Sequence, residues 1–338
     1  IIIAGERRWR ATKHAGLHHA ELRYRQRYID FWANPEALRV MKLRARVVQR
    51  VRRVLDERGY VEVETPVLQV LAGGAAARPF RTHMNALDLP LFMRIAPELY
   101  LKRLLVGGMP RVYELSRNFR NEGLDRNHNP EFTMLEAYQA YGDVETMMEL
   151  TETLVRESAR VVVQERAEAR AASGQGAAAE GALAEDLRLA FGAHTVDYGP
   201  AFERVRYGEL FMRAMGFSMA DHERARKEAA ARHIKTRNEQ GVELDGWLVV
   251  NALFEEAAEP LLDPSRPTFI THYPSAISPL TRPTVEDPTV ADRADLFIGG
   301  MELAPHYTEL NDPDVQEAKF REQLQGLDEE ESTFRTFD

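Results

Sequence analysis

The sequence of 338 residues contains no cysteine, which excludes disulfide bonds and thiolate metal sites and is compatible with a reducing cytoplasm. No run of about 18 apolar residues occurs, so we expect no membrane-spanning helix, and the opening "IIIAG" is too short for the core of a signal peptide. Glycine pairs occur at 73–74, 107–108 and 299–300, yet neither G-x-G-x-x-G nor G-x-x-x-x-G-K-[ST] is present. These absences argue against a dinucleotide-binding fold and against a P-loop fold.

What the sequence does contain is an uneven distribution of charge. The formal net charge is −9, yet residues 1–58 hold 15 basic and 6 acidic residues, a net of +9, which leaves −18 for the remainder. A basic segment of this kind fits either a docking face for a polyanion or a solvated helix face. The overall negative charge argues against a general nucleic-acid coat protein.

The order of the expected elements predicts an α+β fold with a mostly antiparallel sheet. Apolar spacing and the cap Asn34-Pro35-Glu36 predict a helix over residues 34–58 that ends at Gly59. Further helices are expected over 97–108, from 143 to about 164, over 207–262 with an internal turn, and in the charged tail 312–338. Strands are expected over 60–70 as far as Pro66, over 91–96, in a hairpin of 111–120 and 131–141, at the start of 267–280, and over 295–303. Residues 1–33 are expected to be irregular, and the low-complexity stretch 165–184 to be a surface insertion.

The predicted hairpin surrounds the dense stretch "RNFRNEGLDRNHNPEF" at residues 117–132, which combines arginines, acids and a histidine. Because side chains alternate along a strand, one face carries polar groups that end in an arginine, and the return strand offers an aromatic ring, an acid and a phenol. The guanidinium of an arginine can donate two hydrogen bonds to a carboxylate or a phosphate, and an aromatic side chain beside it can stack on the planar base of a nucleotide. A solvated sheet face would alternate in the same way, but an unpaired acid in an otherwise apolar strand would be costly. The first strand carries Glu114, Ser116, Asn118 and Arg120 on this face, and the return strand carries Phe132, Met134, Glu136 and Tyr138.

A second acidic group lies in "DLFIGGMELAPHYTEL", where Asp295 and Glu302 flank a strand and Glu309 follows one loop later. A site that offers only carboxylate oxygens, with no His or Cys ligands, suits Mg²⁺ that bridges phosphates. The plainer alternative is a pair of carboxylates on the protein surface, which is common.

At this point the sequence resembles a known family. "RNFRNEG…HNPEFTMLE" resembles motif 2 of the class II aminoacyl-tRNA synthetases, and in particular of the lysyl-tRNA synthetases. "RYRQRYIDFWANPE", "RVLDERGYVEVETPVL", "GGAAARPF", "MRIAPELYLKRLLVGG" and "TELNDP" match that subfamily in the same order. The resemblance implies a class II antiparallel sheet flanked by helices, with a helical insertion at about 207–262, and activation of lysine by ATP for transfer to tRNA(Lys). It also implies a homodimer through the helix 34–58 and the strand that ends at Pro66.

The resemblance further implies roles for individual residues. Arg120 would bind both the lysine carboxylate and the ATP α-phosphate and would stabilise charge in the transition state. Phe132 would stack on adenine, and Glu122, His128 and Asn129 would position ATP. Gly74 and Glu98 would meet the lysine α-amine, Glu136, Tyr138 and Glu309 would hold the ε-ammonium, and Asp295 and Glu302 would carry Mg²⁺. Glu98 and His128 also have plainer interpretations, as a first-turn acid of a helix and as a turn residue.

The chain departs from the family pattern in several places. Where the family reads E-x-A-N-G-F-S-E-L, this chain reads "ELAPHYTEL", so Pro305 replaces an asparagine that contacts lysine and His306 replaces a glycine. Asp295 replaces a glutamate, and Ala276 stands where an acid is common. We expect a fragment of a longer enzyme, in which residues 1–33 are a linker from an anticodon-binding domain and 34–338 are a catalytic domain without its third motif. The alternatives are a paralogue that lysylates a protein such as elongation factor P, and a non-catalytic interaction module.

Overall fold

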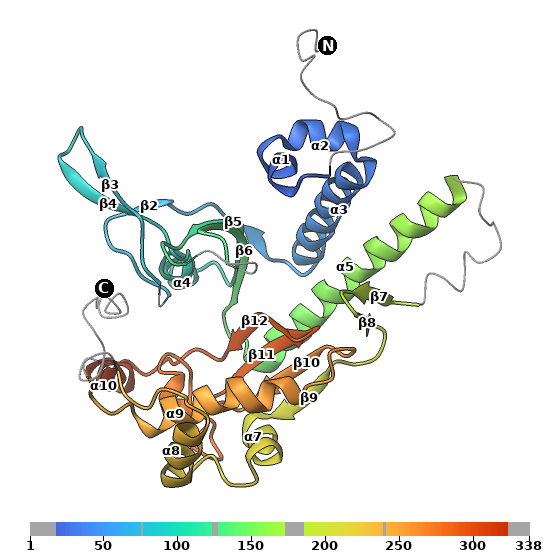
Figure 1. Ribbon diagram of the computed structural model, residues 1–338. Coiled ribbons are helices and arrows are strands. Elements are labelled where there is room, and N and C mark those ends of the chain that lie inside the picture. Colours follow the sequence, from blue (N-terminus) through green and yellow to red (C-terminus); the bar gives the residue numbers. More distant parts are fainter. Residues whose placement is uncertain (1–17, 76, 124–127, 173–185, 239–240, 324–338) are drawn as a thin grey trace. The chain divides into compact units, whose positions relative to one another are not determined.

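The computed structural model describes residues 18–75, 77–123, 128–172, 186–238 and 241–323 (Figure 1). The chain divides into two compact units, each of which is described by itself. The first unit combines Ile1–Val54 with Leu154–Leu187, and the second combines Leu55–Thr153 with Arg188–Asp338.

The first unit is helical. The buried carboxylate of Asp30 accepts hydrogen bonds from the guanidinium groups of Arg23 and Arg27 at 2.8 and 2.5 Å. Asn34 donates a third at 2.6 Å. Because a buried charge is tolerated only when it is paired, these donors hold two short helices together. The prediction of an irregular segment was therefore wrong for residues 20–33. The elements are α1 (Ala20–Arg25), α2 (Arg27–Ala33), most of α3 (Pro35–Glu57) and the C-terminal part of α5 (Val144–Ala172).

The two long helices were predicted with different success. The prediction of a helix over 34–58 is confirmed by α3 to within one residue at each end, and Gly59 follows with a positive φ of 77°. Helix α5 runs to Ala172, beyond the predicted end near 164, because residues 165–172 are strong helix formers. Glu165 and Glu168 also form ion pairs with arginines of α3. Of the predicted insertion 165–184, the part from 173 lies outside the described residues.

The second unit contains four small sheets, which confirms the α+β class. Three strands form the order β1-β5-β6, three form β2-β4-β3, four form β12-β11-β10-β9, and β7 pairs with β8. All pairings are antiparallel except β1 with β5 and β9 with β10. The bounds are β1 (Val61–Glu62), β2 (Leu68–Gln69), β3 (Arg81–Met84), β4 (Leu89–Met93), β5 (Arg111–Phe119), β6 (Glu131–Gln139), β7 (Arg188–Phe191), β8 (His194–Asp197), β9 (Glu203–Arg206), β10 (Thr268–Thr271), β11 (Arg293–Ile298) and β12 (Met301–Tyr307).

Strands β5 and β6 form the long antiparallel hairpin that the alternation predicted. The register pairs Glu114 with Glu136, Ser116 with Met134 and Asn118 with Phe132. Residues directly opposite each other point to the same face, so the two sets singled out in the sequence share one face of the sheet. Helix α4 (Glu98–Val106), which was predicted over 97–108, packs against this hairpin (Figure 1).

Two strand predictions need correction, and four strands were missed. The stretch 60–70 holds two short strands, β1 and β2, in different sheets, because Pro66 between them has no N–H to donate. The single strand expected over 295–303 is a hairpin of β11 and β12, turned by Gly299 and Gly300 with φ of 61° and 79°. Strands β3, β7, β8 and β9 were not predicted.

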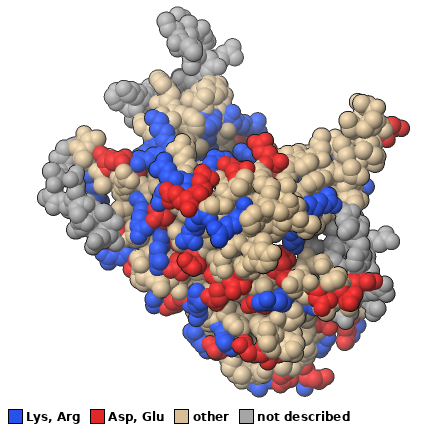
Figure 2. Space-filling model, turned by 180° about the vertical axis from the view of Figure 1, so that it is seen from behind, with Lys and Arg blue, Asp and Glu red and all other residues tan. Residues whose placement is uncertain are grey.

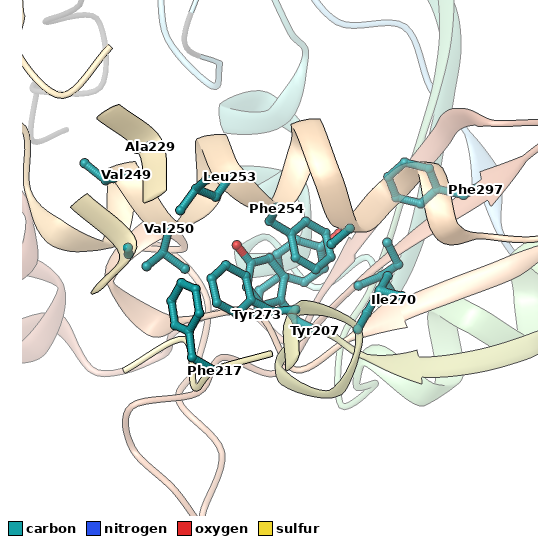
Figure 3. Close-up of a cluster of buried hydrophobic side chains, with 14 residues drawn as sticks. Tyr207, Phe217, Ala229, Val249, Val250, Leu253, Phe254, Ile270, Tyr273 and Phe297 are labelled. Carbon is teal, nitrogen blue, oxygen red and sulfur yellow. The ribbon is translucent and has the colours of Figure 1, made fainter. Parts of the chain in front are cut away.

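The helical prediction for 207–262 is confirmed for 207–215, 222–231 and 246–261, whereas the described residues between 232 and 245 are not helical. These helices enclose the main apolar core of the second unit (Figure 3). The rings of Tyr207 and Phe254 stack with centroids 3.7 Å apart, and Tyr273 packs beside them. This core includes residues of α7 (Tyr207–Met215), α8 (His222–Ala231), α9 (Gly246–Leu253), the π-helix η1 (Phe254–Ala258), β10 and β11. The short helices η2 (Glu259–Leu261) and η3 (Ser275–Ile277) follow. Helix α10 (Pro313–Gln323) confirms the first part of the helix-prone tail 312–338, whose remainder from 324 lies outside the described residues.

Charges of both signs are interspersed on the face of the molecule shown in Figure 2. Several of the arginines of α3 are neutralised by glutamates of α5, as the pair of Arg50 with Glu157 at 2.6 Å illustrates. Part of the excess positive charge of residues 1–58 is therefore paired with acidic side chains inside the first unit. Within the described residues, no helix is both long enough and apolar enough to span a membrane.

Candidate functional site

The β5–β6 hairpin presents buried polar atoms on the face that carries the predicted site residues. The side chain of Asn118 is fully buried, and its Oδ1 has no hydrogen-bond partner among the described residues; the same holds for the Oγ of Ser116. A buried polar atom that lacks a partner costs about 1–3 kcal/mol, so such atoms call for an explanation, and a ligand or ordered water supplies one. This face is polar where a purely structural sheet would be apolar.

Arg120 and Phe132 meet where the hairpin strands end. The guanidinium carbon of Arg120 lies 5.2 Å from the centroid of the Phe132 ring, within the range of a cation–π contact. The backbone N–H of Arg120 donates to the carbonyl of Pro130 at 2.9 Å, and its Nε is 3.5 Å from the carbonyl oxygen of Ile95. Neither contact neutralises the guanidinium, so its charge stays directed at the face of the hairpin.

Glu136 and Tyr138 lie on the same strand and face. The hydroxyl of Tyr138 donates a hydrogen bond to the carboxylate of Glu136 at 3.1 Å. Burial, and next the negative charge of Glu98, raise the pKa of the Glu136 carboxyl to about 7, against the lowering effects of Tyr138 and Arg120. Burial raises the pKa of Tyr138 well above its ordinary value, and the charges of Glu136, Glu98 and Glu309 add to this. The negative charges of three glutamates therefore act on one phenol.

Glu98 and Glu309 are joined by a residue that the sequence had not singled out. The ammonium of Lys102 donates to Glu98 at 2.7 Å and to Glu309 at 3.1 Å. Gly74 lies against the same glutamate, since a Cβ at this position would be 2.9 Å from the Cβ of Glu98 and its φ is 86°. Only glycine fits there without displacing the acid. The structure thus brings Gly74 and Glu98 together, and Lys102 bridges Glu98 to Glu309.

The remaining predicted ATP contacts lie on the connection between the strands. Glu122, His128 and Asn129 are exposed, and residues 124–127 between them are outside the described part of the chain. Glu122 and Asn129 make no side-chain hydrogen bond or ion pair with any residue that the structure describes. The contact of these three residues with ATP therefore stays a prediction.

Asp295 and Glu302, the predicted Mg²⁺ ligands, lie on β11 and β12. The buried carboxylate of Asp295 accepts two hydrogen bonds from Arg293, at 3.1 and 2.6 Å. Burial and then the charge of Asp295 raise the pKa of Glu302. Burial, followed by the charge of Glu255 and then those of Glu302 and Asp295, raises the pKa of Glu259 to about 7. Among the described residues, no three His, Cys, Asp or Glu side chains are grouped so that they could hold a metal ion.

The two departures on β12 have different surroundings. Pro305 lies directly opposite Asp295. His306 is buried, with Nδ1 3.0 Å from the carbonyl oxygen of Ala294 and Nε2 2.8 Å from the hydroxyl of Thr151. Burial lowers the pKa of His306, which favours its neutral form. His306 therefore connects β12 with β11 and α5.

Sequence reasoning missed three basic residues of the site: Lys102, Arg293 and Arg94. Lys102 follows Glu98 by four residues in a predicted helix, and this spacing would have indicated the ion pair. Arg293 shares a strand face with Asp295 two residues later, which period-2 alternation would have revealed. The pairing of Arg94 with Glu114 at 2.6 Å has no local signal in the sequence.

Comparisons with known proteins agree with this geometry. The family model described as "tRNA synthetases class II (D, K and N)" matches residues 19–337. A lysine–tRNA ligase of Pseudomonas aeruginosa (strain LESB58) is 44% identical over 320 residues, which are 94% of this chain and 58% of that protein. Lysine–tRNA ligases of Cronobacter sakazakii and Carboxydothermus hydrogenoformans are each 42% identical, over 320 and 326 residues. The chain spans 58% to 62% of the length of these relatives. It belongs to the class II tRNA synthetases of the group for aspartate, lysine and asparagine.

Proposed function

We propose that the protein is a lysine–tRNA ligase, which activates lysine with ATP and transfers it to the 3′ end of tRNA(Lys). The observation that carries the substrate assignment is a group of three carboxylates: Glu136 accepts a hydrogen bond from Tyr138, and Lys102 joins Glu98 to Glu309. An amino acid with two ammonium groups supplies the positive charge that such a set favours. The names of the relatives support the same substrate.

The proposed reaction has two displacement steps. A carboxylate oxygen of lysine attacks the α-phosphorus of ATP, which forms lysyl-adenylate and releases pyrophosphate. The terminal ribose hydroxyl of tRNA then attacks the adenylate carbonyl carbon, loses its proton and releases AMP. No side-chain nucleophile takes part, so catalysis depends on positioning and on charge stabilisation.

The proposed site residues can be divided into those that bind ATP and those that bind lysine. Arg120 binds the lysine carboxylate and the α-phosphate, and Phe132 stacks on adenine. Glu122, His128 and Asn129 contribute further ATP contacts from the exposed connection. Gly74 and Glu98 accommodate the lysine α-amine. Glu136, Tyr138 and Glu309 hold the ε-ammonium, in agreement with the hydrogen bond that Tyr138 donates to Glu136.

Mg²⁺ is the metal ion that this proposal implies, with Asp295 and Glu302 as its protein ligands. The donor chemistry fits, because both offer oxygen ligands and their like charges raise the pKa of Glu302, a repulsion that a cation would relieve. When bound, the ion would neutralise charge on the phosphates. Arg293 already hydrogen-bonds both oxygens of Asp295 and therefore fixes the orientation of this carboxylate.

The remaining parts of the proposal concern organisation. We infer a catalytic domain over residues 34–338, with a class II antiparallel sheet flanked by helices, a variable insertion at 165–184 and a helical insertion at about 207–262. Residues 1–33 are the proposed linker to an anticodon-binding domain. The enzyme is a homodimer and acts in the cytoplasm, where proteins are synthesised.

The decisive experiment is ATP–pyrophosphate exchange by the protein at its full natural length, with each of the twenty amino acids in turn. We expect exchange with lysine alone, followed by charging of tRNA(Lys). A preference for aspartate or asparagine would overturn the substrate assignment. Exchange without tRNA charging would favour the paralogue that modifies a protein, and no exchange at all would favour a non-catalytic module.

A further inference from the structure

The ammonium of Lys102 lies between two carboxylates that the proposed function gives to the substrate. It donates to Oε1 of Glu98 at 2.7 Å and to Oε2 of Glu309 at 3.1 Å. Glu98 and Lys102 lie one turn apart on α4, whereas Glu309 follows β12 and is separated from Lys102 by 207 residues. The fold therefore brings a cation and two anions together from distant parts of the chain.

The surroundings favour a charged Lys102. Burial lowers its pKa, but the negative charges of Glu98 and Glu309 more than compensate, so that the pKa lies above its ordinary value. The contact engages one oxygen of each carboxylate. The second oxygen of Glu98 lies towards Gly74, where a Cβ would be 3.6 Å away. Lys102 is a primary ammonium on a four-carbon stem, which is the same chemical group as the side chain of the proposed substrate.

We propose that Lys102 is an internal competitor of the substrate, whose ammonium pairs with Glu98 and Glu309 in the free enzyme and is displaced when lysine binds. This inference rests on the proposed function, because it takes the assignment of these two carboxylates to substrate ammonium groups as given. The side chain of Lys102 is 30% exposed and that of Glu309 40% exposed, so a flexible lysine stem has a route to water.

The exchange has a clear electrostatic consequence. Partly buried carboxylates are costly without a counter-ion, and Lys102 neutralises them until lysine arrives. Each substrate ammonium then replaces a contact that the protein already had, so the net gain on binding is smaller than two new ion pairs would give. Lys102 thereby weakens lysine binding, and it weakens the binding of a ligand without an ε-ammonium less, because such a ligand competes with Lys102 for Glu98 alone.

The test compares Lys102→Met, which deletes the charge, with Lys102→Arg, which keeps it, in the protein at its full natural length. Binding of lysine and of norleucine, its analogue without the ε-amine, is measured by calorimetry. We expect Lys102→Met to bind lysine about fivefold more tightly, the effect of one partly exposed ion pair, and norleucine with a smaller gain, because norleucine competes for Glu98 alone. Lys102→Arg should stay within about threefold of the unchanged protein.

A second measurement separates competition from a structural role. Methylammonium, added at millimolar concentration, should compete with lysine in Lys102→Met and have little effect on the unchanged protein, since it replaces the missing cation. Equal or weaker lysine binding by Lys102→Met would overturn the inference, as would a loss of its folded structure, because Lys102 would then be a structural counter-ion. If the unchanged protein does not bind lysine at all, the proposed function fails instead.

Discussion

Glu136 shows at the scale of one residue how the site prepares for a cation. Its carboxyl is placed beside Glu98 and Glu114 in a partly buried position, and its pKa is raised from 4.5 to about 7. A carboxylate with so high a pKa is one that the protein stabilises poorly in its charged form. A substrate ammonium would remove this cost, and the energy released would contribute to selective binding.

We predict that Glu136→Gln will reduce lysine activation by roughly tenfold to a hundredfold, because a charge-assisted contact contributes about 1.5–3 kcal/mol. The KM for ATP should barely change, since the proposed ATP contacts come from Phe132 and Arg120 and not from the Glu136 carboxylate. Pyrophosphate exchange at varied lysine and ATP concentrations measures both effects. Glu131→Gln, on the same strand at an exposed position, is the control. Equal weakening of both substrates would mean that Glu136 only supports the hairpin.

The raised pKa of Glu136 also predicts the pH dependence of lysine binding. Only the ionised carboxylate attracts the ε-ammonium, so affinity should rise up to about tenfold per pH unit below pH 7 and level off above it. The pKa of Glu309 is raised by burial, which acts in the same direction. Titration calorimetry between pH 5.5 and pH 8.5 would measure the profile. It should be markedly flatter in Glu136→Gln, and an unchanged profile in this variant would assign the titration to another group.

At the scale of elements, a buried ion pair connects the segment after β4 to strand β5. Arg94 and Glu114 are each 3% exposed, and Arg94 also donates to the backbone carbonyl of Arg117 at 2.9 Å. The hydroxyl of Thr65 donates to the second oxygen of Glu114 at 2.6 Å. Three segments of the chain are thus held together on the face of the hairpin that carries the candidate site.

We predict that Arg94→Met will lower the free energy of unfolding by about 3–5 kcal/mol, because it leaves the carboxylate of Glu114 buried and unpaired. Arg117→Met should change it by less than about 1 kcal/mol, since Arg117 is 57% exposed and 3.6 Å from its partner. Urea denaturation provides both values. A further substitution, Glu114→Leu, in the Arg94→Met background should restore part of the loss. If the double variant is no more stable than Arg94→Met, the unpaired charge is not the cause.

Local sequence signals predicted the longer elements well and the short ones poorly. Helix α3 and the β5–β6 hairpin carry their caps, periodicity and alternation within a few turns of chain. Strands β3, β7 and β9, of four residues each, are too short for such a pattern to develop, and their pairing depends on distant partners. Helices α1 and α2 were missed because they depend on the burial of Asp30 among its donors, which periodicity does not reveal.

At the scale of the whole molecule, a motif pattern in the sequence identified the candidate site residues, whereas only the folded structure shows which of them contact one another. Alternation along the hairpin indicated that Phe132 and Glu136 share a face, and the register confirms it. The contact between Lys102 and Glu309 joins positions 207 residues apart, so no window of sequence contains it. Charge balance at the site is therefore a property of the folded chain.

We predict that the full-length protein is a homodimer, since apolar side chains are exposed on the helix that the family resemblance assigns to the dimer interface and in the segment directly after Pro66. In the first unit, α3 exposes Val40 and Met41 at 46% and 43%, and in the second unit the segment 67–71 exposes Leu68 and Val70 at 52% and 58%. Apolar groups of this kind mark interaction surfaces, and a twofold axis buries the same patch of both copies.

Light scattering at micromolar concentration should give twice the monomer mass, and Leu68→Asp should shift the equilibrium towards monomer, because burying its carboxylate in an apolar contact is costly. Val285→Asp is the matched control, since Val285 is 93% exposed and lies outside both regions. If the protein at full length is a monomer, or if both variants dissociate it equally, α3 and the segment 67–71 do not form the interface. Their apolar side chains would then require a different partner.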